Sequence, residues 1–165
     1  MDDFCVSLYK ECGRRAEGLN HVLCVQDTTE LNYGSNSGRI DAKDEHFGYG
    51  TGQGSQNCLF VHPALVLDAS NGLPIGYSSL KIWGRGNSEP GKKHARRRLP
   101  LAEKESYRWA ESAKNTAQYI SSDVCKTMVG DRENDSYEVM CNTLNSGCEF
   151  LIRSSSNRTT VQDGK

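Results

Sequence analysis

Two aspartates follow directly after apolar, β-branched runs, and they constrain the fold more than any other feature of the sequence. Val22-Leu23-Cys24-Val25 leads to Asp27, and Cys125-Lys126-Thr127-Met128-Val129 leads to Asp131. Runs of this kind favour strands, so both acids are expected at strand ends. Carboxylates at the ends of neighbouring strands can hold a divalent metal against a phosphate. The third acid that such a site normally needs is not evident in the sequence.

The spacing of the two acids also allows a simpler interpretation. Aspartate is a common capping residue, and Asp131 precedes a predicted helix while Asp27 precedes a polar loop. Each acid could therefore cap the element that follows it. From spacing alone, capping is the more economical of the two interpretations.

Length, net charge and cysteine content limit the class of protein further. A chain of 165 residues is expected to form one main domain with a real core, and a net charge of −1 predicts no general attraction to polyanions. The acidic N-terminus has no apolar signal segment and no run reaches membrane-spanning length, so a cytoplasmic protein is expected. The seven cysteines are then expected to be reduced, with Cys24, Cys58 and Cys125 in the core. No short-spaced cysteine pair indicates a structural zinc site.

Hydrophobic periodicity predicts the order of the elements. A weak helical pattern over 1–20 is interrupted by Gly13 and Gly18, and the polar, glycine-rich segment 28–56 is expected to be a flexible excursion. Ser70-Asn71-Gly72 predicts a hairpin turn, and Pro63 suggests a bulge or an edge in the strand before it. The remaining predicted elements are strands over 21–26, 57–69, 73–85, 124–130 and 148–153, and helices over 101–121 and 135–144.

This order predicts an α/β fold with a mixed sheet of about five strands and flanking helices. An antiparallel meander followed by two crossover-connected parallel strands is the ribonuclease H-like arrangement. In it the first and fourth strands are neighbours, so Asp27 and Asp131 meet at one end of the sheet. The predicted organisation is a helical lead-in over 1–20, a catalytic core over 21–154 and a polar tail over 155–165.

Three ordered motifs carry a family resemblance. They are Val25-Gln26-Asp27-Thr28-Thr29-Glu30-Leu31-Asn32-Tyr33, Glu103-Lys104-Glu105-Ser106-Tyr107-Arg108-Trp109 and Asp131-Arg132-Glu133-Asn134-Asp135. Together with the strands that bear His62 and Phe150-Leu151-Ile152-Arg153, they resemble the DDE transposases typified by transposon five, the insertion-sequence-four group. The resemblance runs from about His21 to Arg158.

The resemblance implies a ribonuclease H-like core that cuts and joins DNA with two Mg²⁺ or Mn²⁺ ions. Asp27 and Asp131 match the first two metal-binding acids of the family, and Arg153 matches a position near the bound DNA end. In such enzymes a metal-activated water attacks the phosphodiester, and the freed 3′-hydroxyl then attacks the opposite strand to form a hairpin. The implied partner is DNA at transposon ends, on which the full-length proteins dimerise.

The sequence departs from the family in its last catalytic element. The third acid of the family lies on a late helix in a Tyr-Arg-Glu-Lys pattern, which Tyr107-Arg108 and Glu111 do not reproduce. Glu138 and Glu149 are interpreted as ordinary surface residues. The chain is therefore expected to be a catalytic-domain fragment, truncated before the β-rich insertion and last catalytic helix, and inactive alone.

Two other functions remain open. The basic segment with Lys92, Lys93, His94, Arg96, Arg97 and Arg98 is either a solvated loop or a phosphate-backbone contact, so the chain could be a non-catalytic DNA-binding remnant. A strand followed by Asp-x-Thr also opens aspartyl-phosphate phosphatase sites of the haloacid dehalogenase type. Those sites usually carry a second acid where this chain has Thr29, which makes the phosphatase the weaker alternative.

Overall fold

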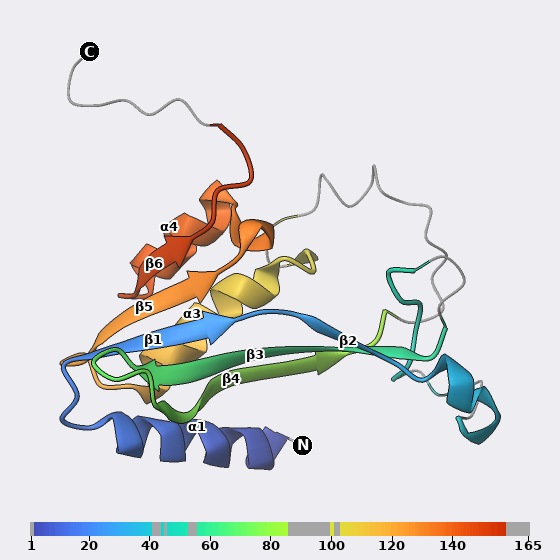
Figure 1. The fold of residues 1–165 in the computed structure, drawn as a ribbon, viewed down its shortest axis with the longest axis horizontal. Helices are drawn as coiled ribbons and strands as arrows, with labels where there is room; N and C mark the ends of the chain where they lie inside the picture. The colour runs from blue at the N-terminus through green and yellow to red at the C-terminus, as the bar shows by residue number, and fades with distance from the viewer. Residues whose placement is uncertain are drawn as a thin grey trace.

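The computed structural model describes residues 2–40, 44, 46–52, 56–85, 100 and 103–157. Its centre is a six-stranded mixed sheet (Figure 1). The strands are β1 (His21–Gln26), β2 (Thr29–Asn32), β3 (Cys58–Asp68), β4 (Pro74–Trp83), β5 (Cys125–Gly130) and β6 (Glu149–Ile152). β3 runs antiparallel to β4 on one side and to β1 and β2 on the other, while β5 is parallel to β1 and β6 is parallel to β5.

This topology is broadly compatible with a ribonuclease H-like fold and confirms the expected neighbours β1 and β5. β2 was not expected from the sequence, because it lies in the segment interpreted as a flexible excursion. It continues the path of β1 along β3: Gln26 pairs with Ala64, and Thr29 pairs with Val61. The two-residue break between them, Asp27 and Thr28, is thus an interruption of one long strand.

The position of Pro63 is explained by the same break. Pro63 lies on β3 between the residues paired with β1 and those paired with β2, so its missing N–H leaves no ladder partner unsatisfied on that side. The expected bulge is also present, since the pairing of β3 with β4 shifts register between Ala64 and Leu65.

Among the described residues, three α-helices accompany the sheet: α1 (Asp2–Ala16), α3 (Tyr107–Tyr119) and α4 (Tyr137–Asn145). α1 runs through Gly13, where the sequence predicted a break. Gly13 is instead a contact point, because a Cβ atom there would collide with the backbone oxygen of Tyr119 at the end of α3. Across the described residues, none of the helices combines the length and the apolar composition that crossing a membrane requires.

α3 is also shorter than the pattern 101–121 predicted. It begins at Tyr107, so Glu103 and Glu105 precede the helix and do not occupy its first turn. Glu105 is instead bound by the guanidinium of Arg85, with Nη2 to Oε1 at 2.8 Å. The Glu105 carboxylate is therefore paired with Arg85 and does not lie in the first turn of α3.

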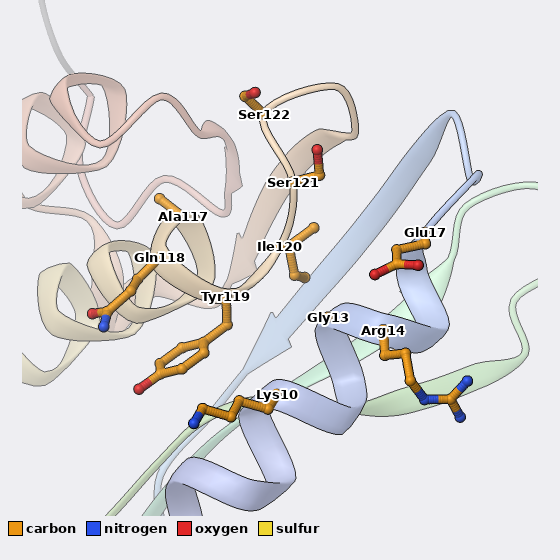
Figure 2. A pocket seen from close by; sticks show the side chains of 10 residues that line it. All are labelled: Lys10, Gly13, Arg14, Glu17, Ala117, Gln118, Tyr119, Ile120, Ser121 and Ser122. Atoms are coloured by element: carbon orange, nitrogen blue, oxygen red, sulfur yellow. The ribbon is translucent and has the colours of Figure 1, made fainter.

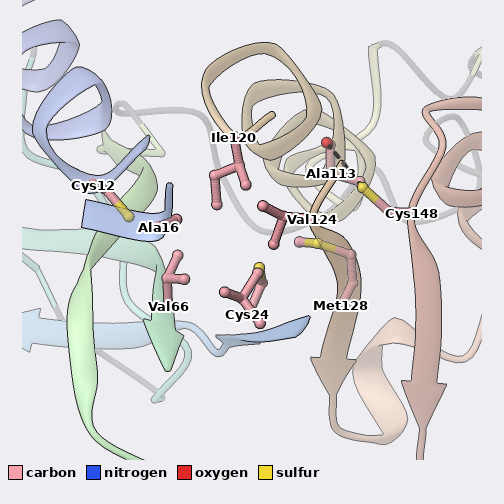
Figure 3. Packing of buried hydrophobic residues seen from close by; sticks show 10 residues of the cluster. Cys12, Ala16, Cys24, Val66, Ala113, Ile120, Val124, Met128 and Cys148 are labelled. Carbon is pink, nitrogen blue, oxygen red and sulfur yellow. Dashed lines mark hydrogen bonds between the residues drawn. The ribbon is translucent and has the colours of Figure 1, made fainter. Parts of the chain in front are cut away.

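The core lies between one face of the sheet and the helices α1 and α3 (Figure 3). Cys24 and Cys58 are buried, as predicted, but the prediction for Cys125 is wrong, because its side chain is exposed. Side chains alternate along a strand, and β5 directs Met128 into the core. Cys125, three residues earlier, therefore points to the opposite face.

The middle of that opposite face exposes apolar side chains. Val25 and Leu151, which both pair with Val129, are 36% and 64% exposed. Ile82, paired with Val61 farther along the sheet, is 40% exposed. The described helices therefore bury one side of the sheet and leave apolar side chains exposed on the other side.

Candidate functional site

The parallel register of β1 and β5 brings Asp27 and Asp131 to the same end of the sheet. Val25 pairs with Val129, and each aspartate follows its valine by two residues. Both aspartates are exposed. Two acids 104 positions apart in the chain (131 − 27) thus lie on adjacent strand ends, as the sequence predicted.

Each of the two carboxylates already accepts one backbone hydrogen bond. Asp131 is the N-cap of the 3-10 helix η3 (Arg132–Asn134) and accepts from the N–H of Glu133 at 2.8 Å. Asp27 accepts from the N–H of Thr28 at 2.7 Å. The capping interpretation therefore describes Asp131 correctly. Within the described residues, however, Oδ2 of each carboxylate accepts no hydrogen bond, so capping leaves an oxygen for a cation.

A glycine fixes the turn that carries Asp131. A Cβ atom on Gly130, the last residue of β5, would lie 2.6 Å from Nδ2 of Asn134, which is 1% exposed. Only glycine allows Asn134 to fold back over the strand end at this distance. The Gly130-Asp131 sequence therefore sets the position of the carboxylate through close packing.

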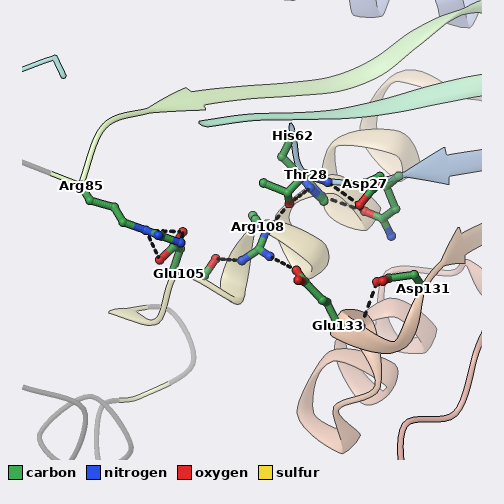
Figure 4. Close-up of polar contacts among 9 residues, drawn as sticks. Asp27, Thr28, His62, Arg85, Glu105, Arg108, Asp131 and Glu133 are labelled. Carbon is green, nitrogen blue, oxygen red and sulfur yellow. Dashed lines mark hydrogen bonds and ion pairs between the residues drawn. The ribbon is translucent and has the colours of Figure 1, made fainter. Parts of the chain in front are cut away.

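A buried polar chain supports the Asp27 side of the site (Figure 4). Nε of Arg108 donates to Oγ1 of Thr28 at 2.8 Å, and Oγ1 lies 2.9 Å from Nδ1 of His62. Arginine can only donate, so the Thr28 oxygen accepts from Arg108 and its own hydrogen is available for Nδ1 of His62. In that tautomer Nε2 of His62 carries the ring proton and faces Oε1 of Gln26 at 3.3 Å.

His62 is neutral in this chain of hydrogen bonds. Burial, together with the nearby positive charge of Arg108, lowers the pKa of His62 from 6.5 to about 3. The ring is fully buried and stands edge-on to Trp109, with ring centroids 4.5 Å apart. At neutral pH His62 is therefore an uncharged, buried residue that hydrogen-bonds Thr28 and Gln26.

Arg108 connects the two acidic segments. Besides Thr28, it binds Oε2 of Glu133 through Nη2 at 3.0 Å and the backbone oxygen of Glu105 through Nη1 at 3.0 Å. Its side chain is only 10% exposed, and burial lowers its pKa. Arg108 thus joins the residue after Asp27 to the residue two after Asp131. In the sequence Arg108 belongs to one of the three motifs, but nothing there indicates this role.

Of the other residues, Arg153 and the basic segment were predicted to contact DNA, whereas Glu138 and Glu149 were expected to be ordinary surface residues. Arg153 is exposed and its backbone N–H donates to the oxygen of Gly130, so it lies at the same sheet end as Asp131. Glu138 is exposed and pairs with Lys104 at 3.5 Å, whereas Glu149 begins β6 at the opposite end. The basic residues Lys92, Lys93, Arg96, Arg97 and Arg98 lie outside the described residues.

No third ligand for a cation joins the two aspartates within the described ranges. The one group of three potential ligands found there is elsewhere, at His21, Cys125 and Glu149. Glu133 is the nearest acid in sequence to Asp131, and its carboxylate is engaged by Arg108. Asp27 and Asp131 therefore form at most part of a two-ion site.

A separate cleft of about 650 Å³ lies between α1 and the end of α3 (Figure 2). Lys10, Arg14 and Glu17 line it from α1, and Tyr119 and Ser121 line it from the other side. The cleft contains neither aspartate, so it is not part of the site described above.

The comparisons with known proteins identify no family. No protein-family description matches the sequence, and no curated protein is similar to it. Among solved structures, the chain is similar to the cryo-EM structure of the piggyBac transposase synaptic complex with hairpin DNA, with a TM-score of 0.37 and 16% sequence identity. The match covers 84% of this chain and 24% of that chain, so this chain spans about a quarter of the length of that protein.

Proposed function

We propose that the chain is part of the catalytic core of a DNA transposase, with a ribonuclease H-like fold and an incomplete two-metal site. The observation that carries the proposal is the β1–β5 register, because it supports a shared role for Asp27 and Asp131. Both acids are exposed hard-oxygen donors on rigid strand ends, which suits Mg²⁺ or Mn²⁺.

In this function Asp27 and Asp131 would hold the cation, each through the carboxylate oxygen that accepts no backbone hydrogen bond. When bound, such ions activate water and stabilise the charge that develops on the phosphodiester. Arg108, Thr28 and His62 keep the segment after β1 in place, so that Asp27 does not have to be ordered when the cation arrives.

Arg153 supplies a positive charge beside this end of the sheet, where a DNA phosphate would approach. The proposal requires a third acidic ligand from residues outside the described ranges or from a partner chain. The protein alone is accordingly expected to bind the metal weakly and to cleave little DNA.

A phosphatase function has less support. Thr29, where a second acid would be needed, is an exposed residue at the start of β2. Non-catalytic DNA binding through the basic segment from Lys92 to Arg98, which lies outside the described residues, is the remaining competitor.

Calorimetric titration with Mn²⁺ tests the proposal. The wild-type chain is expected to bind weakly, and Asp27→Asn and Asp131→Asn are each expected to weaken binding by at least about tenfold, or about 1.4 kcal/mol. Asp123→Asn is the matched control, because Asp123 is exposed and lies in the turn before β5, at the other end of the sheet. Equal binding by all three variants and the wild type would contradict the proposal.

A further inference from the structure

A second group of ligating side chains lies at the opposite end of the same three strands. His21, Cys125 and Glu149 are the first residues of β1, β5 and β6. His21 pairs directly with Cys125, and Glu149 pairs with Thr127, two residues farther along β5. Backbone pairing alone therefore brings an imidazole, a thiol and a carboxylate together on the open face of the sheet.

The side chains converge as well as the backbones. One potential ligand atom from each of the three residues lies within 4.8 Å of the other two. His21 is half-buried, while Cys125 and Glu149 are exposed, so the group is accessible to a solvated ion. For His21 that atom is one of the two ring nitrogens.

Thr127 holds two of the three side chains in position. Its hydroxyl lies 2.9 Å from Nε2 of His21 and donates to Oε2 of Glu149 at 3.3 Å. Because that hydroxyl gives its hydrogen to Glu149, it accepts from Nε2–H of His21, which leaves Nδ1 with the free lone pair. Histidines that bind metals usually have their second nitrogen held by a hydrogen bond of this kind.

We propose that His21, Cys125 and Glu149 bind one Zn²⁺ ion, with water as the fourth ligand. A nitrogen, a sulfur and an oxygen donor suit a borderline-soft, tetrahedral ion, and zinc accepts all three. The same set is poor for Mg²⁺, which prefers oxygen ligands. Binding releases the thiol proton of Cys125, so the thiolate is the ligand.

A bound Zn²⁺ would connect the starts of three adjacent strands. β6 is the outermost of them and has only four residues, so it gains most from a link to β1 and β5. The ion would therefore act as a structural clamp, away from Asp27 and Asp131 and independent of any reaction there.

Titration of the metal-free chain with Co²⁺, a spectroscopic substitute for Zn²⁺, tests this site. One equivalent is expected to produce a thiolate-to-cobalt charge-transfer band and the visible bands of a tetrahedral ion. Cys125→Ser is expected to abolish the charge-transfer band. His21→Gln and Glu149→Gln are each expected to weaken Co²⁺ binding by at least about tenfold. Zn²⁺ is expected to displace Co²⁺ and to raise the melting temperature.

Two control variants distinguish this site from a different thiol and from the aspartates at the far end of the strands. Cys141→Ser removes another partly accessible thiol and is expected to leave the band unchanged. Asp27→Asn is expected to leave it unchanged too, so that failure of the transposase proposal does not affect this result. Circular dichroism without metal checks that each variant is folded. Absence of the band in the wild type, or its persistence in folded Cys125→Ser, would overturn the proposal.

Discussion

The two ends of the β1–β5 pair carry different chemistry on the same strands. At the ends where the strands finish, two exposed carboxylates stand over a buried network of Arg108, Thr28 and His62. Where the strands begin, a half-buried His21 and an exposed Cys125 lie side by side, and the Thr127 hydroxyl hydrogen-bonds His21. The core therefore positions the residues around the aspartates, whereas strand pairing positions His21 and Cys125.

Replacing Arg108 should separate the two ends most clearly. Arg108→Met removes a largely buried cation together with the three hydrogen bonds that it donates. The Thr28 hydroxyl then loses its donor. We expect a loss of about 3 kcal/mol in the free energy of unfolding, measured by urea denaturation. Cys125→Ser, at the other end, is expected to change the metal-free value by less than about 0.5 kcal/mol.

Equal losses in these two variants would contradict the distinction between a core-supported end and a surface end. Lys104→Met serves as the control, since Lys104 makes only a 3.5 Å pair with an exposed carboxylate.

The pH dependence of stability reports on the buried His62 at the end with the aspartates. The pKa of His62 is lowered from 6.5 to about 3 in the folded chain. Between these two pH values the unfolded chain therefore binds a proton at His62 and the folded chain does not. Stability is therefore complete above about pH 6.5 and falls as the pH drops toward 3. The slope approaches about 1.4 kcal/mol per pH unit, or about 2 kcal/mol between pH 6.5 and pH 5.

His62→Gln is expected to flatten this part of the stability profile in urea denaturation at several pH values. An unchanged slope in that variant would assign the acid sensitivity to other groups.

A smaller effect is expected in DNA binding. Arg153→Gln should weaken binding to duplex DNA about twofold to tenfold and reduce the slope of log affinity against log salt by about one, because one phosphate contact is lost. Fluorescence anisotropy at several salt concentrations measures both. Lys114→Gln, on the exposed side of α3, should have no effect on either quantity.

The sequence predicted the end with the aspartates much better than the other end. Asp27 and Asp131 come at the ends of apolar runs, and the end of such a run is visible in the sequence. The extents of β1, β3, β4 and β5 followed from the same hydrophobic pattern within one or two residues. β2 was missed because Thr29–Asn32 is short and polar, and it is a strand only because β3 pairs with it.

The remaining features depend on register or packing, which periodicity does not supply. The grouping of Cys125 with His21 and Glu149 requires knowing which residues are opposite each other across three strands. The apolar neighbours of Cys125 suggested burial, but its face of the sheet is open. The role of Arg108 depends on three hydrogen-bond partners from distant parts of the chain or from backbone.

Paramagnetic broadening by Mn²⁺ locates the bound ion, so it shows whether Asp27 and Asp131 share a cation. In an amide NMR spectrum, substoichiometric Mn²⁺ is expected to broaden the signals of Thr28, Arg132 and Glu133 first, and to spare those of Val22 and Lys126. Asp27→Asn and Asp131→Asn should each abolish the selective broadening. Broadening that centres on other residues, or that is the same in both variants as in the wild type, would contradict a shared cation site at these strand ends.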